Sequence, residues 1–141
     1  MESGEIIEAL GMQPHPEGGH YVETWRGPAG PDGRPTATAI YFLLRPGERS
    51  HWHRVDASEV WMHHDGAPLE LSIHDETAHN ETTTTVMVGR DLAAGERPQA
   101  VVPAHAWQAA RPVGGWSLVS CIVAPGFDFA GFELAPPGWT P

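Results

Sequence analysis

Short β-prone runs, separated at regular intervals by glycine and proline, constrain this chain more than any other feature. Sixteen glycines and fourteen prolines punctuate the 141 residues, and the runs between them are rich in β-branched and aromatic side chains. Runs of this length and spacing are typical of antiparallel sandwiches and barrels. We therefore predict an all-β fold with strands at residues 20–26, 36–44, 50–55, 58–64, 68–74, 83–88, 99–103, 107–111, 116–124 and 130–135.

One short helix is expected before these strands. Ile6, Ile7 and Leu10 are spaced to fall on one helical face, and Ser3 is placed to cap the first turn. Gly11 follows where a left-handed residue commonly ends a helix. The N-terminus is therefore predicted to lay one apolar helical face against the β-structure.

Composition limits the partners and the compartment. Eighteen acidic residues face eight arginines and no lysine, for a formal charge of −10, which argues against nucleic acid and anionic membranes as partners. The sequence begins without an export signal, and no run approaches the length of a membrane span, so we expect a cytoplasmic protein with one domain over residues 1–141. The polar segment 74–85 is expected to be a loop, whose order the sequence leaves open. Cys121, the single cysteine, lies in an apolar run and is expected to be a buried, inert thiol.

Four histidines surround a glutamate in residues 50–64, across two predicted strands. Side chains alternate along a strand, so His51 and His53 are expected to share one face, while Glu59 and His63 share a face of the next strand. Residues two apart on one face are about 7 Å apart, close enough for two imidazoles to converge on one metal ion. This stretch is therefore the first candidate for a functional site.

The same stretch resembles the first motif of the cupin superfamily. That motif reads Gly, five residues, His-x-His, three or four residues, Glu, six residues, Gly. Gly47, His53, Glu59 and Gly66 match its spacing throughout, and Val55 stands at the position of the second metal-binding histidine. The stretch therefore matches the spacing of the motif but lacks one of its metal ligands.

The second cupin motif, Pro-x-Gly followed by two residues and His, resembles residues 103–108, PAHAWQ. His105 occupies the position of its glycine, and Gln108 occupies that of its metal-binding histidine. Of the four ligands that the resemblance implies, only His53 and Glu59 are present.

A closer resemblance covers nearly the whole chain. Residues 10–26, 50–71 and 101–135 are similar to the uncharacterised cupin family DUF985, or Cupin_5. Met62 and His105 depart from its pattern, whereas the HPEGG segment ending at Gly19 matches it, as do His53, Arg54, Glu59, Trp61, Gly66 and Trp107. The resemblance implies a cupin double-stranded β-helix, or jelly roll, with a ligand cavity inside the barrel and a homodimer as the assembly; it implies no general activity.

Two chemistries remain open for the histidine-rich stretch. In the first, His51 replaces the lost ligand, and a divalent transition metal is held by His51, His53 and Glu59, with Gln108 as a fourth ligand. In the second, no metal is bound, and His53 and Glu59 form a buried acid/base or ligand-binding pair. The missing second histidine favours the metal-free alternative.

Further residues are candidates to contact a small-molecule ligand. Glu17 could be turned towards a cavity mouth by Gly18 and Gly19, although a charged loop residue is more commonly exposed. An arginine at the cavity could hold a carboxylate or phosphate, although arginines in strands more commonly pair with glutamate. Together, the ligand-binding candidates are Glu17, Glu23, Arg26, Tyr41, Trp61, His63, Trp107 and Gln108.

Three functions are compatible with this reading. The first is an epimerase, isomerase or lyase that acts on a small polar, sugar-like or carboxylated metabolite by proton transfer at His53 and Glu59. The second is a cupin that binds a small molecule without chemistry. The third, a metal-dependent enzyme such as a dioxygenase, is the least favoured, because it needs ligands that the sequence lacks.

Overall fold

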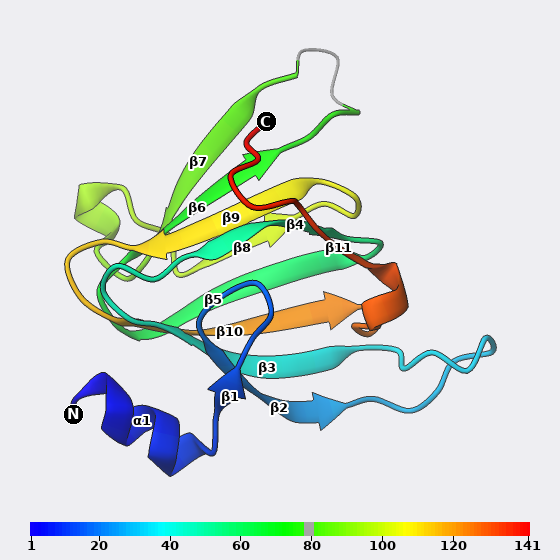
Figure 1. The fold of residues 1–141 in the computed structure, drawn as a ribbon, viewed down its shortest axis with the longest axis horizontal. Coiled ribbons are helices and arrows are strands. Elements are labelled where there is room, and N and C mark those ends of the chain that lie inside the picture. The colour runs from blue at the N-terminus through cyan, green and yellow to red at the C-terminus, as the bar shows by residue number, and fades with distance from the viewer. Residues whose placement is uncertain (78–80) are drawn as a thin grey trace.

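Two antiparallel sheets face each other in the computed structural model, which describes residues 1–77 and 81–141 (Figure 1). The first sheet contains, in spatial order, β1 (Gln13–Pro14), β2 (His20–Arg26), β3 (Thr38–Leu44), β10 (Ser117–Ala124), β5 (Ser58–Gly66) and β8 (Gln99–Val102). The second contains β11 (Phe132–Leu134), β4 (Ser50–Val55), β9 (Trp107–Pro112), β6 (Leu69–His74) and β7 (Thr83–Val88). Strands distant in sequence are neighbours, as in the pairing of β3 with β10. The predicted all-β jelly roll is confirmed.

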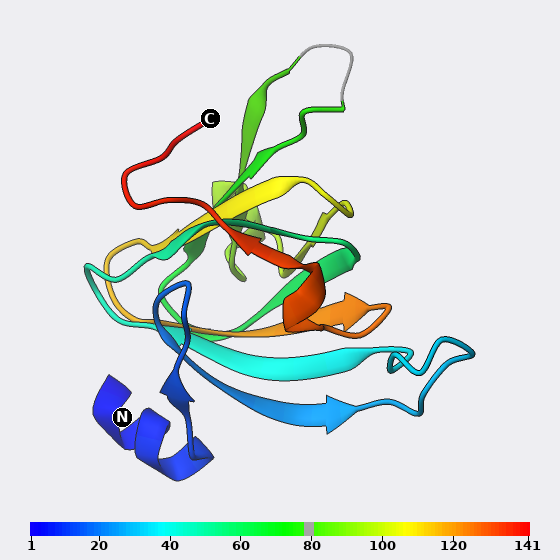
Figure 2. The same ribbon diagram turned by 45° about the vertical axis from the view of Figure 1, so that its right-hand side comes forward.

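The helix α1 (Ser3–Leu10) lies against the outer face of the first sheet (Figure 2). Its residue Ile6 packs with Leu43 of β3, as the apolar spacing predicts. The cap differs from the prediction: Glu2 precedes the first turn, and its backbone amide donates to Glu5 at 2.6 Å. Gly11 ends the helix with φ 65°. No helix in the described ranges 1–77 and 81–141 is long and apolar enough to cross a membrane.

The strands that flank the polar segment 74–85 end and begin where the runs 68–74 and 83–88 predicted them. The β6–β7 pair continues to His74, which lies opposite Thr83, so both ends of the segment are strand. Residues 78–80, within the segment, lie outside the described residues. Two short 3-10 helices occupy other connections, η1 (Leu92–Ala94) and η2 (Phe129–Gly131).

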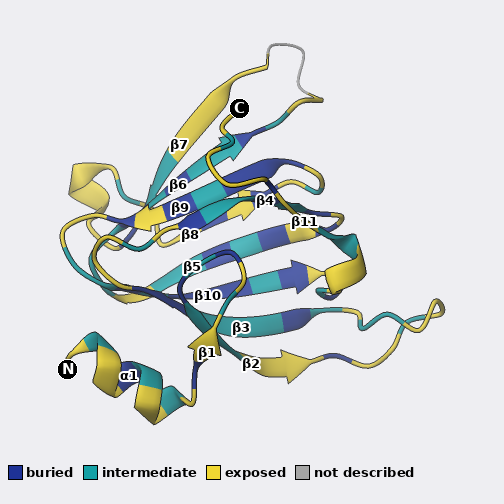
Figure 3. Ribbon diagram, viewed as in Figure 1, coloured by how far each residue is buried: buried dark blue, intermediate teal, exposed yellow. Residues whose placement is uncertain are grey.

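One end of the space between the sheets is filled with apolar side chains. Buried residues dominate β10 and β9 and are mixed with partly exposed ones on β3 and β5 (Figure 3). The largest of them is Trp61, which is fully buried and contacts Phe42 with ring centroids 5.9 Å apart. The cluster also contains Leu44, Leu69, Leu71, Val88, Val102 and Val119. Packing of both inner faces against each other at this end holds the two sheets together.

Candidate functional site

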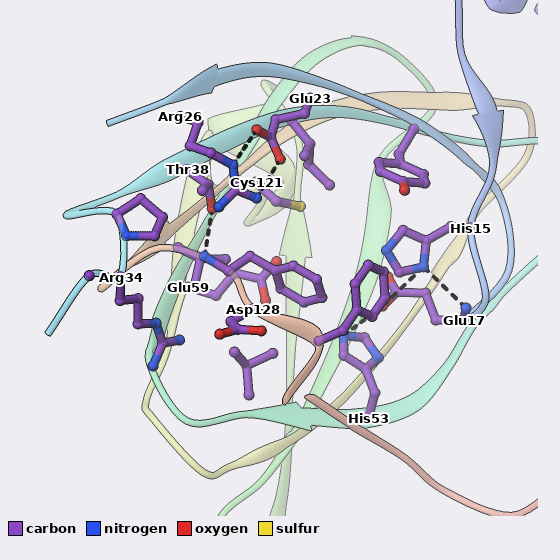
Figure 4. A pocket seen from close by; sticks show the side chains of 18 of the residues that line it. His15, Glu17, Glu23, Arg26, Arg34, Thr38, His53, Glu59, Cys121 and Asp128 are labelled. Atoms are coloured by element: carbon purple, nitrogen blue, oxygen red, sulfur yellow. Dashed lines mark hydrogen bonds and ion pairs between the residues drawn. The ribbon is translucent and has the colours of Figure 1, made fainter. Parts of the chain in front are cut away.

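The other end of the interior is hollow. A cavity of about 510 Å³ lies there, with residues from β2, β3, β4, β5 and β10 in its wall (Figure 4). Its interior is polar, with His15, Glu17, His53, Glu59 and Cys121; its mouth is formed by Glu23, Arg26, Asp32, Arg34, Phe127, Asp128 and Phe129. A concave site with a few convergent titratable groups is the usual form of a small-molecule site.

A tight turn brings Glu17 into the cavity. The amide of Gly18 donates to the carbonyl of His15 at 3.0 Å, and the amide of His51 on β4 donates to the carbonyl of Glu17 at 2.8 Å. Gly18 has φ 113°, and a Cβ there would overlap the backbone carbonyl of Arg49, so only glycine fits. As a result the Glu17 side chain is only 5% exposed. The expectation that a charged loop residue here stays exposed is wrong.

A β-bulge decides which residues of β4 face the cavity. Ser50 lies opposite Ala110 and His53 opposite Gln108, so three steps on β4 match two on β9. Ser50 and His53 therefore both point inward, and both are buried. His51, expected to share the face of His53, instead places its Nε2 3.0 Å from the carbonyl of Pro136 in the C-terminal segment.

The contacts of His53 and Glu17 indicate which of their atoms carry protons. His53 Nδ1 lies 2.7 Å from the carbonyl of His51 and must donate to it, because a carbonyl only accepts. Its Nε2 lies 3.2 Å from Glu17 Oε2, and the hydroxyl of Ser50 donates to Glu17 Oε1 at 3.0 Å. Burial raises the pKa of Glu17 to about 8, and burial lowers the pKa of His53. Near neutral pH both groups are therefore uncharged, and the Glu17 carboxyl lies next to the unprotonated Nε2 of His53.

Glu59 is the second buried carboxyl of the cavity. Burial raises its pKa to about 7. The amide nitrogen of Gln108 donates to Glu59 Oε1 at 3.0 Å, and the amide oxygen of Gln108 accepts from the indole of Trp61 at 2.8 Å. An indole only donates, so Trp61 fixes which end of the Gln108 amide faces Glu59. Trp61 and Gln108 thus hold Glu59 in place rather than form the cavity wall.

His15 and Cys121 complete the interior. The His15 ring stacks on Phe42 with centroids 5.6 Å apart, and its Nδ1 accepts from the amide of Glu17 at 3.1 Å. Burial and, to a smaller extent, His53 together lower its pKa to about 4, so His15 is neutral at pH 7. Burial raises the pKa of the Cys121 thiol, followed by the effect of Glu59, which agrees with an inert thiol.

The residues do not fit the metal site that the cupin fold implies. Val55 carries no donor atom, both ends of the Gln108 amide are engaged, and His51 faces the C-terminal segment. Within residues 1–77 and 81–141, no group of three or more His, Cys, Asp or Glu side chains is arranged to hold a metal ion. Of the metal set proposed from the sequence, Glu59 and Gln108 are hydrogen-bonded and His53 lines the same cavity as Glu59, whereas His51 turns away.

Three predicted ligand-binding residues lie away from the cavity. Tyr41 packs in the cluster beneath α1, on the outer face of the first sheet. His63 places its Nε2 3.0 Å from the carbonyl of Ala67. Trp107 donates to Glu76 at 3.0 Å and carries the guanidinium of Arg54 4.4 Å above its ring. Alternation along β9 sends Gln108 inward and therefore Trp107 outward.

The strand arginines are paired with glutamates. Arg26 contacts Glu23 at the mouth at 2.9 Å, Arg54 contacts Glu133 at 2.8 Å, and Arg111 contacts Glu70 at 2.9 Å. The ion-pair alternative is therefore confirmed for these three. His105, at the position of the motif glycine, is exposed and keeps the left-handed conformation with φ 70°.

Several residues that line the cavity or support its side chains are not singled out in the sequence analysis. His15 and Ser50 contact Glu17, and Arg34, Phe127 and Asp128 form part of the mouth. The Gly18–Gly19 pair beside His15 was the one available signal, because consecutive glycines indicate a close backbone approach. Ser50 could not be found by alternation, since the bulge of β4 reverses it.

Comparison with known proteins places the fold in context. The model of Cupin_5, described as Cupin superfamily (DUF985), matches residues 4–135. A solved protein from Shewanella oneidensis is 40% identical, with a TM-score of 0.88 over 96% of this chain and 85% of the other. A hypothetical protein from Leishmania major is 36% identical, with a TM-score of 0.85 over 96% and 88%. No curated protein gives a significant match.

A more distant solved structure shares the fold alone. It is a dTDP sugar isomerase from Desulfovibrio desulfuricans, 13% identical, with a TM-score of 0.61 over 84% of this chain and 85% of the other. Identity this low carries no information about substrate or catalytic residues.

Proposed function

The chain belongs to the Cupin_5 (DUF985) family of the cupin superfamily, and we propose that it is an acid/base enzyme, an isomerase, epimerase or lyase acting on a small polar carbonyl compound. One observation carries the proposal: the Glu17 carboxyl contacts His53 Nε2 at 3.2 Å inside a cavity that also holds the buried carboxyl of Glu59. Paired titratable groups whose surroundings move their pKa values towards neutrality are typical of acid/base sites.

Glu59 is the proposed base. With a pKa of about 7, it is partly ionised at neutral pH and can take a proton from a carbon next to a carbonyl. Gln108 holds one oxygen of the carboxylate and fixes its direction. The product of this step is an enolate, whose negative charge requires a nearby proton donor.

The Glu17–His53 pair is the proposed acid. It holds one exchangeable proton between Glu17 Oε2 and His53 Nε2, because His53 Nδ1 is occupied by the carbonyl of His51. The pair returns this proton to the enolate, either on the opposite face of the same carbon or on the neighbouring position. Net charge and protons balance once Glu59 passes its proton back to the pair through solvent or product.

The distant sugar isomerase supports the proposal by analogy only. It shares the barrel, and that protein's name describes a rearrangement of a sugar, which is chemistry of the proposed class. The analogy is a reason to include sugar-like compounds among the substrates tested, and it does not replace a test on this cavity.

Exchange of carbon-bound hydrogen with solvent tests the proposal. The protein is incubated in D₂O with a panel of small aldoses, ketoses, amino sugars and keto acids, and loss of the proton next to the carbonyl is followed by NMR. We expect exchange for at least one compound, and a decrease of about 10²–10⁴-fold in Glu59→Gln. This change keeps the size of the neutral side chain and its contact with Gln108, so the fold is retained.

The control is Glu70→Gln, which alters a surface glutamate paired with Arg111 and is expected to leave exchange unchanged. If compounds bind, as measured by thermal shift, and none of them exchanges, the enzymatic proposal is overturned and the chain is a binding cupin. Equal exchange in wild type and Glu59→Gln would remove Glu59 from the mechanism.

A homodimer through β2 is a second part of the proposal. The strand β1 pairs only with His20 and Tyr21, so among the described residues the outer edge of β2 from Val22 onward has no strand partner. Trp25 on this strand is 51% exposed, and an open edge beside an exposed aromatic ring is a common site of association. Light scattering tests the assembly: a dimer that Trp25→Glu dissociates supports it, and a wild-type monomer overturns it.

A further inference from the structure

The cavity has an excess of acidic groups. Five carboxyl groups contribute to its wall, from Glu17, Glu23, Asp32, Glu59 and Asp128, against two guanidinium groups, from Arg26 and Arg34. The charge that a bound molecule meets depends on which of these groups are already paired.

Both arginines are occupied by carboxylates. Arg26 donates through Nε and one terminal nitrogen to Glu23, at 2.9 and 3.1 Å. Arg34 donates through both terminal nitrogens to Asp56, at 3.0 and 2.7 Å, and through Nε to the carbonyl of Gly126 at 2.6 Å. Two-pronged pairs of this kind use the geometry with which arginine grips an anion. Each arginine keeps further N–H donors, but its charge is already balanced by a carboxylate, so an anionic ligand would meet no net positive charge here.

The remaining carboxyl groups are not balanced in this way. Asp32 accepts from the backbone amide of Arg34 at 3.0 Å, and Asp128 accepts from the amide of Ala130 at 3.0 Å. Glu17 and Glu59 lie deeper, where their contacts are neutral donors, Ser50 and Gln108, and the imidazole of His53. At neutral pH, where Glu17 is protonated, the negative charge of the cavity lies on the carboxylates of Asp32 and Asp128 at the mouth and on the ionised fraction of Glu59 inside.

Aromatic rings add to this preference. Tyr21, Phe127 and Phe129 contribute to the wall, and the rings of Phe127 and Phe129 meet edge to face at 4.8 Å. The faces of such rings attract cations, and aromatic walls combined with carboxylates are the usual surroundings of organic ammonium groups.

We infer that the cavity selects a small polar compound that carries a positive charge, an ammonium group, and rejects carboxylated and phosphorylated compounds. This inference rests on the proposed function for the identity of the site, and it names the substrate class: a carbonyl compound bearing an amine. It replaces the carboxylated substrate that the sequence left open.

The inference predicts a link between binding and protons. A cation placed near Glu17 and Glu59 favours their ionised forms, whereas in the empty cavity their pKa values are about 8 and about 7. For a cation that keeps its charge over this range, binding therefore releases protons near neutral pH, and affinity rises as pH increases from 6.5 to 8. A neutral sugar has neither effect.

Three hexose probes of similar size and different charge test the inference: glucosamine, glucose and glucuronate. Isothermal titration at pH 6.5, where the amine of glucosamine is charged and both carboxyls are still mainly protonated, measures affinity and proton release together in buffers of different ionisation enthalpy. We expect glucosamine to bind at least about 10-fold more tightly than glucose, with proton release, and glucuronate to bind more weakly than both. The double variant Glu17→Gln/Glu59→Gln should lose the preference, and Glu70→Gln should keep it.

Equal or tighter binding of glucuronate, or no response to glucosamine, would overturn the inference. A preference for glucosamine that the double variant retains would do so as well. Failure of this inference can be told apart from failure of the proposed function. Binding of a cation without hydrogen exchange would overturn the enzymatic proposal and support the charge selectivity. Exchange on an anionic or neutral compound would support the enzymatic proposal and overturn the charge selectivity.

Discussion

The two ends of the barrel interior share β3, β5 and β10 and differ in the side chains that these strands place inside. At the filled end, β3 contributes Leu44 and Phe42; at the hollow end, the same face of β3 contributes Ile40 and Thr38. On β5 two successive inward-facing residues mark the boundary: Trp61 is fully buried in the core, and Glu59 lines the cavity. Large side chains close one end, and smaller or ionisable ones leave the other open.

The difference shows where stability and chemistry are located. The filled end buries apolar surface and carries the sheet packing. The hollow end leaves volume open and buries carboxyl groups, which costs stability unless they stay protonated. Trp61 links the ends, because it packs in the core and also orients Gln108 against Glu59. Changes at the filled end should therefore alter mainly stability. Changes in the side chains of the hollow end should alter mainly ligand binding.

The largest effect is expected from Trp61→Ala at the filled end. It opens a large void and leaves the amide oxygen of Gln108 without its donor, so the free energy of unfolding should fall by about 3–5 kcal/mol. Chemical denaturation measures this. Trp61→Phe, which keeps most of the volume, is the control and should cost less. A loss under about 1 kcal/mol in Trp61→Ala would contradict the assignment of stability to this end.

Gly18→Ala tests the turn that forms one wall of the hollow end. The new methyl group would overlap the carbonyl of Arg49, and φ 113° is strained for alanine, so we expect a loss of about 2–3 kcal/mol and withdrawal of Glu17 from the cavity. Thermal unfolding measures the loss of stability, and NMR titration of the Glu17 carboxyl shows whether its raised pKa is lost. Gly33→Ala, also at positive φ but with open space around its Cβ, is the control for strain alone.

The next largest effect is a pH dependence of stability that comes from the buried carboxyls of the hollow end. Unfolding lowers the pKa of Glu17 from about 8, and that of Glu59 from about 7, to the ordinary value of 4.5. Between pH 6.5 and 8 the folded chain binds more protons than the unfolded chain, so stability falls as pH rises, by about 2 kcal/mol in total. The lowered pKa of His15, about 4, acts only below its ordinary value of 6.5.

Glu17→Gln/Glu59→Gln should remove this fall, whereas variants of the filled end should shift the whole curve without flattening it. A wild-type stability that is constant or rising from pH 6.5 to 8 would contradict the buried, protonated state of the two carboxyls.

The smallest effect on stability is expected from filling the hollow end. Ile40→Phe adds volume next to a cavity of about 510 Å³ and should change stability by less than about 1.5 kcal/mol while abolishing ligand binding. Leu44→Phe, on the same face of β3 at the filled end, should cost about 1–3 kcal/mol by overpacking and leave binding intact. Equal costs at both positions would mean that the ends do not differ in packing.

The sequence predicted the strands well and the division of the interior only in part, since Trp61, expected to contact the ligand, lies in the packed core. Strand runs and their alternation located β2 to β11 and the inward positions of Glu59 and Gln108, because period-two patterning is a local property. The β4 bulge could not be predicted, since it depends on pairing with β9, and it exchanged His51 for Ser50 at the inner face. Trp107 was misplaced because proximity to Gln108 in sequence means the opposite face of a strand.

The inward position of Glu17 is a different kind of failure. Residues 15–19 carry a recognisable pair of glycines, but only the contact of Gly18 with Arg49 on the approach to β4 turns the carboxyl inward. Long-range contacts of this kind are not encoded in periodicity, and they explain why the neutral Glu17–His53 pair emerged from the structure alone.

Carboxyl titration by NMR tests the central claim most directly. With glutamate side chains labelled at the carboxyl carbon, the chemical shift of each resonance is followed from pH 3 to pH 9, and Glu17→Gln and Glu59→Gln assign the two of interest. The account predicts that Glu17 titrates at about 8 and Glu59 at about 7, each later than the exposed glutamates. Titration of both near the ordinary value of 4.5 would contradict the buried, proton-sharing site.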